Sequence, residues 1–144
     1  MPQITSSPGD NNFITASVAA TPLLNAKPNF PARIYANEEK KLAFFVSEAI
    51  LESSSYRQIA HTILNWSNYN KCKTVISVAG RKIEKDRTKK ERSLYVISNS
   101  PIIMKELNEI GILTYKNGTV NGIPGILLNE SNWKNIDVVV FVVD

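Results

Sequence analysis

The segment Gly118-Thr-Val-Asn-Gly-Ile-Pro-Gly-Ile-Leu-Leu128 decides the fold of this chain. It holds three of the six glycines and one proline, and it then becomes apolar. Glycine allows positive φ and a close approach of the backbone, where a Cβ would clash. The pattern therefore predicts a strand that ends in a tight turn and leads into a buried helix.

Toward the N-terminus, the sequence predicts a hairpin and then a helix. Residues 33–36 and 42–48 are the two strands of the hairpin, joined by the polar turn 37–41. The second strand is apolar on both faces, which is typical of a central strand. Three serines at 53–55 suit a helix N-cap, and the apolar spacing after them predicts a helix that ends near Tyr69.

A second predicted helix begins at Ser100-Pro101, where serine suits the N-cap and proline the first helical position. It ends at Gly111, and it turns three apolar residues inward, namely Ile103, Leu107 and Ile110. The other predicted elements are a helix through about Trp133 and strands at 73–79, 93–98, 112–115 and 137–143. This alternation of strands and helices predicts a layered α/β fold with a largely buried, mainly parallel sheet.

The length of 144 residues predicts one main domain. Residues 1–30 are polar and weakly periodic, so we expect an irregular segment with a short edge strand at 13–18, and residues 31–144 form the single α/β domain. The chain stops one residue after the apolar strand 137–143, with no helix to follow. We therefore expect that strand to be covered by another chain, by the N-terminal segment or by a continuation of the fold.

The net charge of +4 lies entirely in residues 81–92, which carry seven positive and three negative charges. This segment has one apolar residue, Ile83, and no aromatic residue that could stack on bases. A solvated, mobile loop is the simpler interpretation, and an arm that binds phosphate or an acidic partner is the alternative. Nucleic-acid binding is not favoured. No apolar run is long enough for a membrane helix and no signal peptide is evident, so we expect a cytoplasmic protein.

Residues with obvious chemistry are few. The lone Cys72 excludes an internal disulfide, and the single His61 has no second histidine or cysteine with which to bind zinc. His61 falls on the polar face of the first helix, where we expect a surface residue. No phosphate-binding motif of the P-loop or dinucleotide type is present. The sequence predicts no catalytic residue, no metal and no cofactor.

Five residues nevertheless fall at predicted strand ends or turns, where ligands of open α/β sheets gather. They are Glu48, Gly80, Asn99, Gly122 and Gly125. Together they would line a crevice that binds a partner or a ligand. The alternative is structural: the two polar residues cap helices and satisfy loop amides, and the glycines solve packing.

Several short motifs resemble the archaeal branch of the proteasome assembly chaperone family. They are Pro31-Ala-Arg-Ile-Tyr-Ala36, Leu42-Ala-Phe-Phe-Val-Ser-Glu48, the Tyr56…Ala60…Ile63-Leu-Asn-Trp66 helix, and Gly118…Gly122-Ile-Pro-Gly125-Ile-Leu-Leu128. The resemblance runs from about Pro31 to Asp144. The chain lacks the glycine-rich first turn of the family and the tyrosine of the family's C-terminal docking tail. We therefore expect it to be shortened at both ends relative to the family.

The resemblance implies a three-layer α/β/α fold with a mainly parallel or mixed central sheet, akin to the phosphorylase/hydrolase type. It implies a non-enzymatic role in which the protein contacts proteasome α-subunits or a related chain, as a homo-oligomer or hetero-oligomer. Such proteins have also been assigned to the ATP-grasp enzymes. The alternative function is therefore a small-molecule enzyme of the carboxylate–amine ligase type that uses the strand-end crevice.

Overall fold

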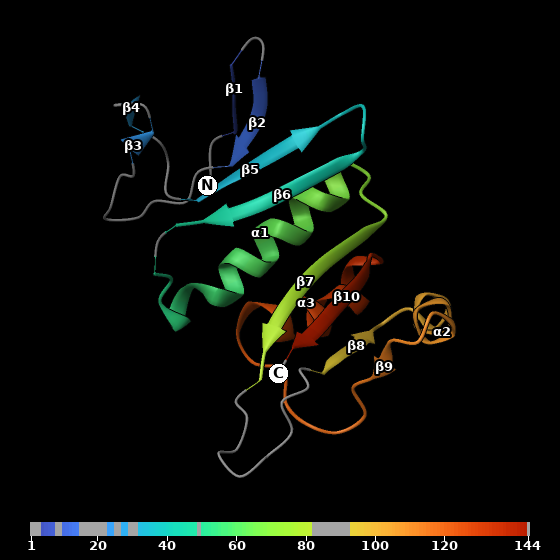
Figure 1. Ribbon diagram of the computed structural model, residues 1–144. Helices are drawn as coiled ribbons and strands as arrows, with labels where there is room; N and C mark the ends of the chain where they lie inside the picture. Colours follow the sequence, from blue (N-terminus) through green and yellow to red (C-terminus); the bar gives the residue numbers. More distant parts are fainter. Residues whose placement is uncertain are drawn as a thin grey trace. The chain divides into compact units, whose positions relative to one another are not determined.

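The computed structural model describes residues 4–7, 10–14, 23–24, 27–28, 32–48, 50–81 and 93–143 (Figure 1). The chain divides into two compact units, Met1–Leu51 and Glu52–Asp144. The boundary predicted after residue 30 therefore falls inside the first unit. The predicted loop at 81–92 lies outside the described residues except for Arg81.

The described residues of the first unit form three antiparallel strand pairs. β1 (Ile4–Ser7) pairs with β2 (Asp10–Ile14), and β3 (Leu23–Leu24) pairs with β4 (Lys27–Pro28). The described part of residues 1–30, a segment expected to be mostly irregular, thus contains four short strands. These strands have only two to five residues each, so they are too short for an alternation of polar and apolar residues to stand out in the sequence.

The predicted hairpin is confirmed as β5 (Ala32–Asn37) and β6 (Leu42–Ser47). The side chain of Asn37 accepts a hydrogen bond from the backbone N–H of Lys40 at 2.8 Å, and Lys41 completes the turn with a φ of +52°. The central position predicted for β6 is wrong within the described part of the chain, where it pairs with β5 only. Alternate β6 side chains are exposed, so its apolar residues do not indicate burial on both faces.

The second unit has a mixed four-stranded sheet in the order β7-β10-β8-β9. Its strands are β7 (Thr74–Gly80), β8 (Leu94–Ser98), β9 (Leu113–Thr114) and β10 (Asp137–Val143). β10 runs parallel to β7 and antiparallel to β8, and β8 runs parallel to β9. The mixed sheet that was expected is present.

β10 is an interior strand, and its valines form much of the core of the second unit. Val138 and Val140 are fully buried, and Val139 and Val142 are nearly so. The expectation that this last strand needs cover from outside is therefore wrong. β10 lies between β7 and β8, and a helix that precedes it in the chain packs against it.

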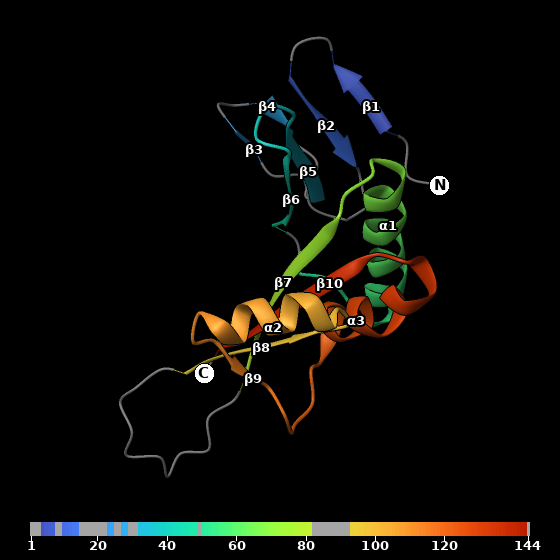
Figure 2. The same cartoon turned by 90° about the vertical axis from the view of Figure 1, so that its right-hand side faces the viewer.

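Three helices accompany the sheet. α1 (Tyr56–Tyr69) follows the 3₁₀ turn η1 (Ser53–Ser55), α2 (Pro101–Glu109) joins β8 to β9, and α3 (Gly122–Lys134) joins β9 to β10. α1 packs on α3, which in turn packs on β10 and β7, and α2 packs on β8 and β9 (Figure 2). The three-layer arrangement remains a prediction.

The ends of α2 follow the sequence prediction closely. Ser100 is the N-cap, Pro101 is the first helical residue, and Gly111 follows the helix with a φ of +93°. The inward position predicted for Ile110 is wrong, because its side chain is 74% exposed. Ile110 is the C-cap residue and has left the helical conformation, so the helical spacing no longer fixes its direction.

Candidate functional site

Glu48 follows β6 in the first unit and forms an ion pair with Arg33 of β5. The guanidinium of Arg33 also lies over the ring of Tyr35, 5.5 Å from its centroid. The side chain of Arg33 is almost fully buried, whereas that of Glu48 is half-exposed. A buried guanidinium needs a compensating charge. Glu48 supplies that charge to Arg33, so its role in this geometry is structural.

Gly80 and Asn99 lie at opposite ends of β10. Gly80 pairs with Val143 near the end of that strand, and a Cβ added to Gly80 would meet no atom within 4 Å. Asn99 holds the other end: its Oδ1 accepts a hydrogen bond from the N–H of Val138 at 2.8 Å, and its Nδ2 donates one to the carbonyl of Ile136 at 3.0 Å. Because β8 runs antiparallel to β7 and β10, its carboxyl end faces away from theirs. No single crevice therefore holds both residues.

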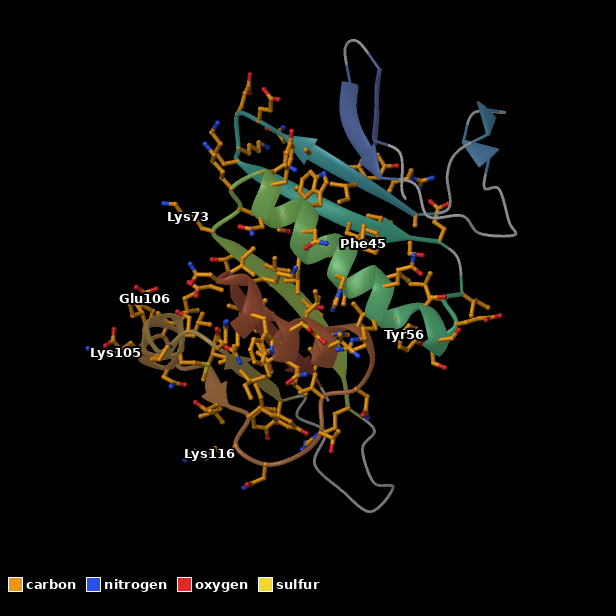
Figure 3. All side chains as sticks on the ribbon, turned by 180° about the vertical axis from the view of Figure 1, so that it is seen from behind. Phe45, Tyr56, Lys73, Lys105, Glu106 and Lys116 are labelled. Atoms are coloured by element: carbon orange, nitrogen blue, oxygen red, sulfur yellow. The ribbon has the colours of Figure 1, made fainter. Side chains whose placement is uncertain are left out.

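Gly122 and Gly125 lie together at the start of α3, each for its own steric reason. Gly122 has a φ of +70°, which side chains rarely adopt. Gly125 has an ordinary φ, but a Cβ at this position would overlap the carbonyl oxygen of Val120. Tyr56, at the first turn of α1 (Figure 3), lies beside Gly122. Both glycines thus shape the backbone where α3 meets the loop before it.

A charged cluster that the sequence did not predict joins α1 to α3. Glu130 accepts a hydrogen bond from Nη2 of Arg57 at 2.8 Å, and its other carboxylate oxygen lies 3.3 Å from Nε2 of His61. The side chain of Glu130 is only 14% exposed. Burial acts to raise the pKa of Glu130, but the hydrogen bonds and charges of Arg57 and His61 together hold that pKa below its usual value.

His61 therefore has an orienting carboxylate, which reasoning from its neighbours in sequence missed. The available signal was that Glu130 is the only acidic residue of α3, a helix that otherwise carries apolar and neutral side chains before Lys134. A carboxylate whose pKa is lowered is a weak base, and an ion pair with Arg57 is a stabilising contact. The cluster is thus better suited to tying two helices together than to proton transfer.

No group of three or more histidine, cysteine, aspartate or glutamate side chains in the described ranges could hold a metal ion. No helix within them is long and apolar enough to cross a membrane.

Among the described residues, exposed apolar side chains form a row on β6 and a second row on β7. In the first unit, Leu42, Phe44 and Val46 share one face of β6, and the ring of Phe44 is 57% exposed. In the second unit, Ile76 and Val78 share one face of β7, and Ile76 is 65% exposed. Contiguous exposed apolar residues mark surfaces that other proteins contact. We refer to them as the β6 row and the β7 row.

Comparison with known proteins relates this chain to others of the same architecture. The model of the PAC2 family matches residues 19–144. A search of curated proteins finds no relative.

Three solved structures illustrate the shared fold. Pyrococcus furiosus PbaA, described as an archaeal homolog of proteasome-assembly chaperone, matches with a TM-score of 0.80 and 23% identity, over 92% of this chain and 55% of that one. Pyrococcus furiosus PbaB, described as an archaeal proteasome activator, matches with a TM-score of 0.68 and 8% identity, over 92% and 62%. A PAC2 family protein of Streptomyces avermitilis matches with a TM-score of 0.57 and 15% identity, over 86% and 54%. This chain thus spans little more than half the length of these proteins.

Proposed function

This chain belongs to the PAC2 family, and from that premise we propose that it is a non-enzymatic, chaperone-like protein that works by contact with other proteins. The resemblance to proteasome assembly chaperones, which rested on short motifs, is confirmed by the family match and by the fold shared with PbaA. We propose proteasome α-subunits, or a chain related to them, as the partner, and self-association as the second mode of contact.

The observation that carries this proposal is the pair of exposed apolar rows on β6 and β7. Side chains such as Phe44 and Ile76 lose contact with water when a partner covers them, and this burial favours association. The alternative of a ligase-type enzyme has less support from the geometry. Among its five candidate residues, Glu48 serves Arg33, and Gly80 and Asn99 lie at opposite ends of β10.

Native mass spectrometry of the purified chain, alone and mixed with proteasome α-subunits, tests the proposal. We expect a stable complex with the α-subunits. We also expect Phe44→Ser and Ile76→Thr to weaken it, because each removes exposed apolar surface from one row.

Ile102→Thr is the matched control, because the side chain of Ile102 is also exposed, at 72%, but belongs to α2 rather than to β6 or β7. That variant should bind as the unaltered chain does. The proposed function would be contradicted if the chain formed no complex with α-subunits. It would also be contradicted if neither Phe44→Ser nor Ile76→Thr weakened that complex.

A further inference from the structure

Two Asn-Gly pairs lie between β9 and the start of α3: Asn117-Gly118 in the loop, and Asn121-Gly122, of which Gly122 is the first residue of the helix. Asparagine followed by glycine is the sequence most open to attack of the backbone on the asparagine side chain, because glycine has no Cβ to hinder the approach. We propose that Asn117 is a site of spontaneous deamidation in the folded protein and that the fold protects Asn121.

The reaction needs only water and the chain itself. The backbone nitrogen of Gly118 attacks Cγ of Asn117, the bond from Cγ to the side-chain nitrogen breaks, and ammonia leaves. The product is a five-membered cyclic imide that has lost the backbone N–H. Water then opens the imide at one of its two carbonyls, which yields aspartate or isoaspartate. Both products carry a carboxylate in place of the neutral amide.

The surroundings of Asn117 leave it free to react. Lys116, Asn117, Gly118 and Thr119 are all exposed, and Figure 3 shows Lys116 on the loop that leads from β9 toward α3. Ring closure requires rotation about the bond between Cα and the carbonyl carbon of Asn117. Residues 116–119 are exposed, and the close contact of Gly118 is with the end of the Tyr115 side chain rather than with backbone. This rotation therefore moves an exposed loop and does not disturb a helix.

Asn121 carries the same dipeptide and is also exposed, but it lies between two backbone segments that are in close contact. The backbone of Gly125 packs so tightly on the carbonyl of Val120 that a Cβ would not fit between them. Asn121 and Gly122 lie between these two contact points, directly before α3 and Pro124. Rotation at Asn121 would break the contact of Val120 with Gly125 and displace the start of the helix. The folded state therefore slows the reaction at Asn121.

Deamidation at Asn117 would alter the part of the chain that shapes the start of α3. A carboxylate at position 117 stands next to Lys116 and changes the charge of an exposed turn. The isoaspartate product also adds one methylene to the backbone directly before Gly118. Gly118 has a φ of +142° and lies so close to the Tyr115 hydroxyl that a Cβ would overlap it, so a longer backbone would displace this contact.

The two sites can be compared within one peptide. Cleavage after lysine and arginine releases residues 117–134 as a single fragment that contains both Asn-Gly pairs. The full chain is incubated at mildly alkaline pH, folded in one sample and unfolded in urea in another, and fragmentation mass spectrometry locates the deamidated residue over time. We expect Asn117 to convert several times faster than Asn121 in the folded sample, and the two rates to approach each other in urea.

The Asn117→Gln variant is the control, because glutamine closes a larger ring and reacts far more slowly. It should remove the fast conversion and leave the rate at Asn121 unchanged. Equal rates at the two sites in the folded chain, faster conversion at Asn121, or no conversion at Asn117 would each overturn the proposal.

Discussion

At the scale of single residues, Gly125 and Gly80 show that glycines alike in sequence have different reasons to be there. A Cβ at Gly125 would overlap the carbonyl oxygen of Val120. A Cβ at Gly80 would meet no atom within 4 Å. The sequence indicated both positions as turn glycines at strand or helix ends. The sequence does not distinguish the two glycines, because the carbonyl of Val120 reaches Gly125 only when the loop before α3 has folded back.

The steric argument at Gly125 gives a direct prediction. Gly125→Ala should lower the free energy of unfolding by about 1–3 kcal/mol, because the new methyl group forces the backbone of the turn apart. Urea denaturation of both proteins measures this difference. Gly80→Ala is the control and should change stability by less than about 0.5 kcal/mol. Equal stability of the two variants would show that the turn can relax at no cost.

Glu130 gives a prediction with a pH signature. Its pKa is held below the usual value by Arg57 and His61 against the opposing effect of burial, so its charged form stabilises the folded chain. The stabilisation is complete above the ordinary pKa of a glutamate and is lost as the pH falls through the lowered pKa. Glu130→Gln should therefore reduce the melting temperature at neutral pH, and the difference should shrink in acid, where the native carboxylate is also protonated.

Glu109→Gln is the matched control for this experiment. Oε1 of Glu109 lies 3.9 Å from Nζ of Lys105 on the same helix, and both side chains are largely exposed. Exposed pairs of this kind contribute little to stability. The control should therefore melt close to the native protein at every pH. A gap for Glu130→Gln that stayed constant into the acid range would show that shape, not charge, matters at position 130.

At the scale of elements, the sequence predicted strands and helices better than their directions. α1 ends at Tyr69 as predicted, because apolar spacing and a polar stop are local signals. The direction of β8 was not predicted, since nothing local to residues 94–98 says whether the strand joins its neighbours parallel or antiparallel. That one reversal places Asn99 at the end of the sheet opposite Gly80. These two candidate residues therefore do not share one edge of the sheet.

The ion pair of Glu130 with Arg57 shows a second limit at this scale. Each residue lies on a helix whose extent the sequence predicted well. Their meeting depends on how α1 packs against α3, and neighbours in sequence do not reveal such packing. The same limit applies to the β6 row, where an apolar strand was predicted correctly but its burial was not.

At the scale of the whole molecule, the division after Leu51 gives a further prediction. The second unit contains its own core, which includes Ala60, Leu64, Leu127 and Val140. We therefore expect residues 52–144, expressed alone, to fold and to unfold in one cooperative thermal transition monitored by circular dichroism. A fragment with helical signal but no cooperative transition would mean that the first unit is needed to complete the fold.

The order of the strands has a consequence for how this sheet is made during synthesis. β10 lies between β7 and β8, yet it comes after both of them in the chain. β7 and β8 therefore leave the ribosome before β10. Neither can form its native pairing with β10 until residues 137–143 have emerged. During that interval the facing edges of β7 and β8 are unpaired and available to strands of other chains. A nascent chain of this protein is most exposed to misassembly of this sheet just before β10 appears.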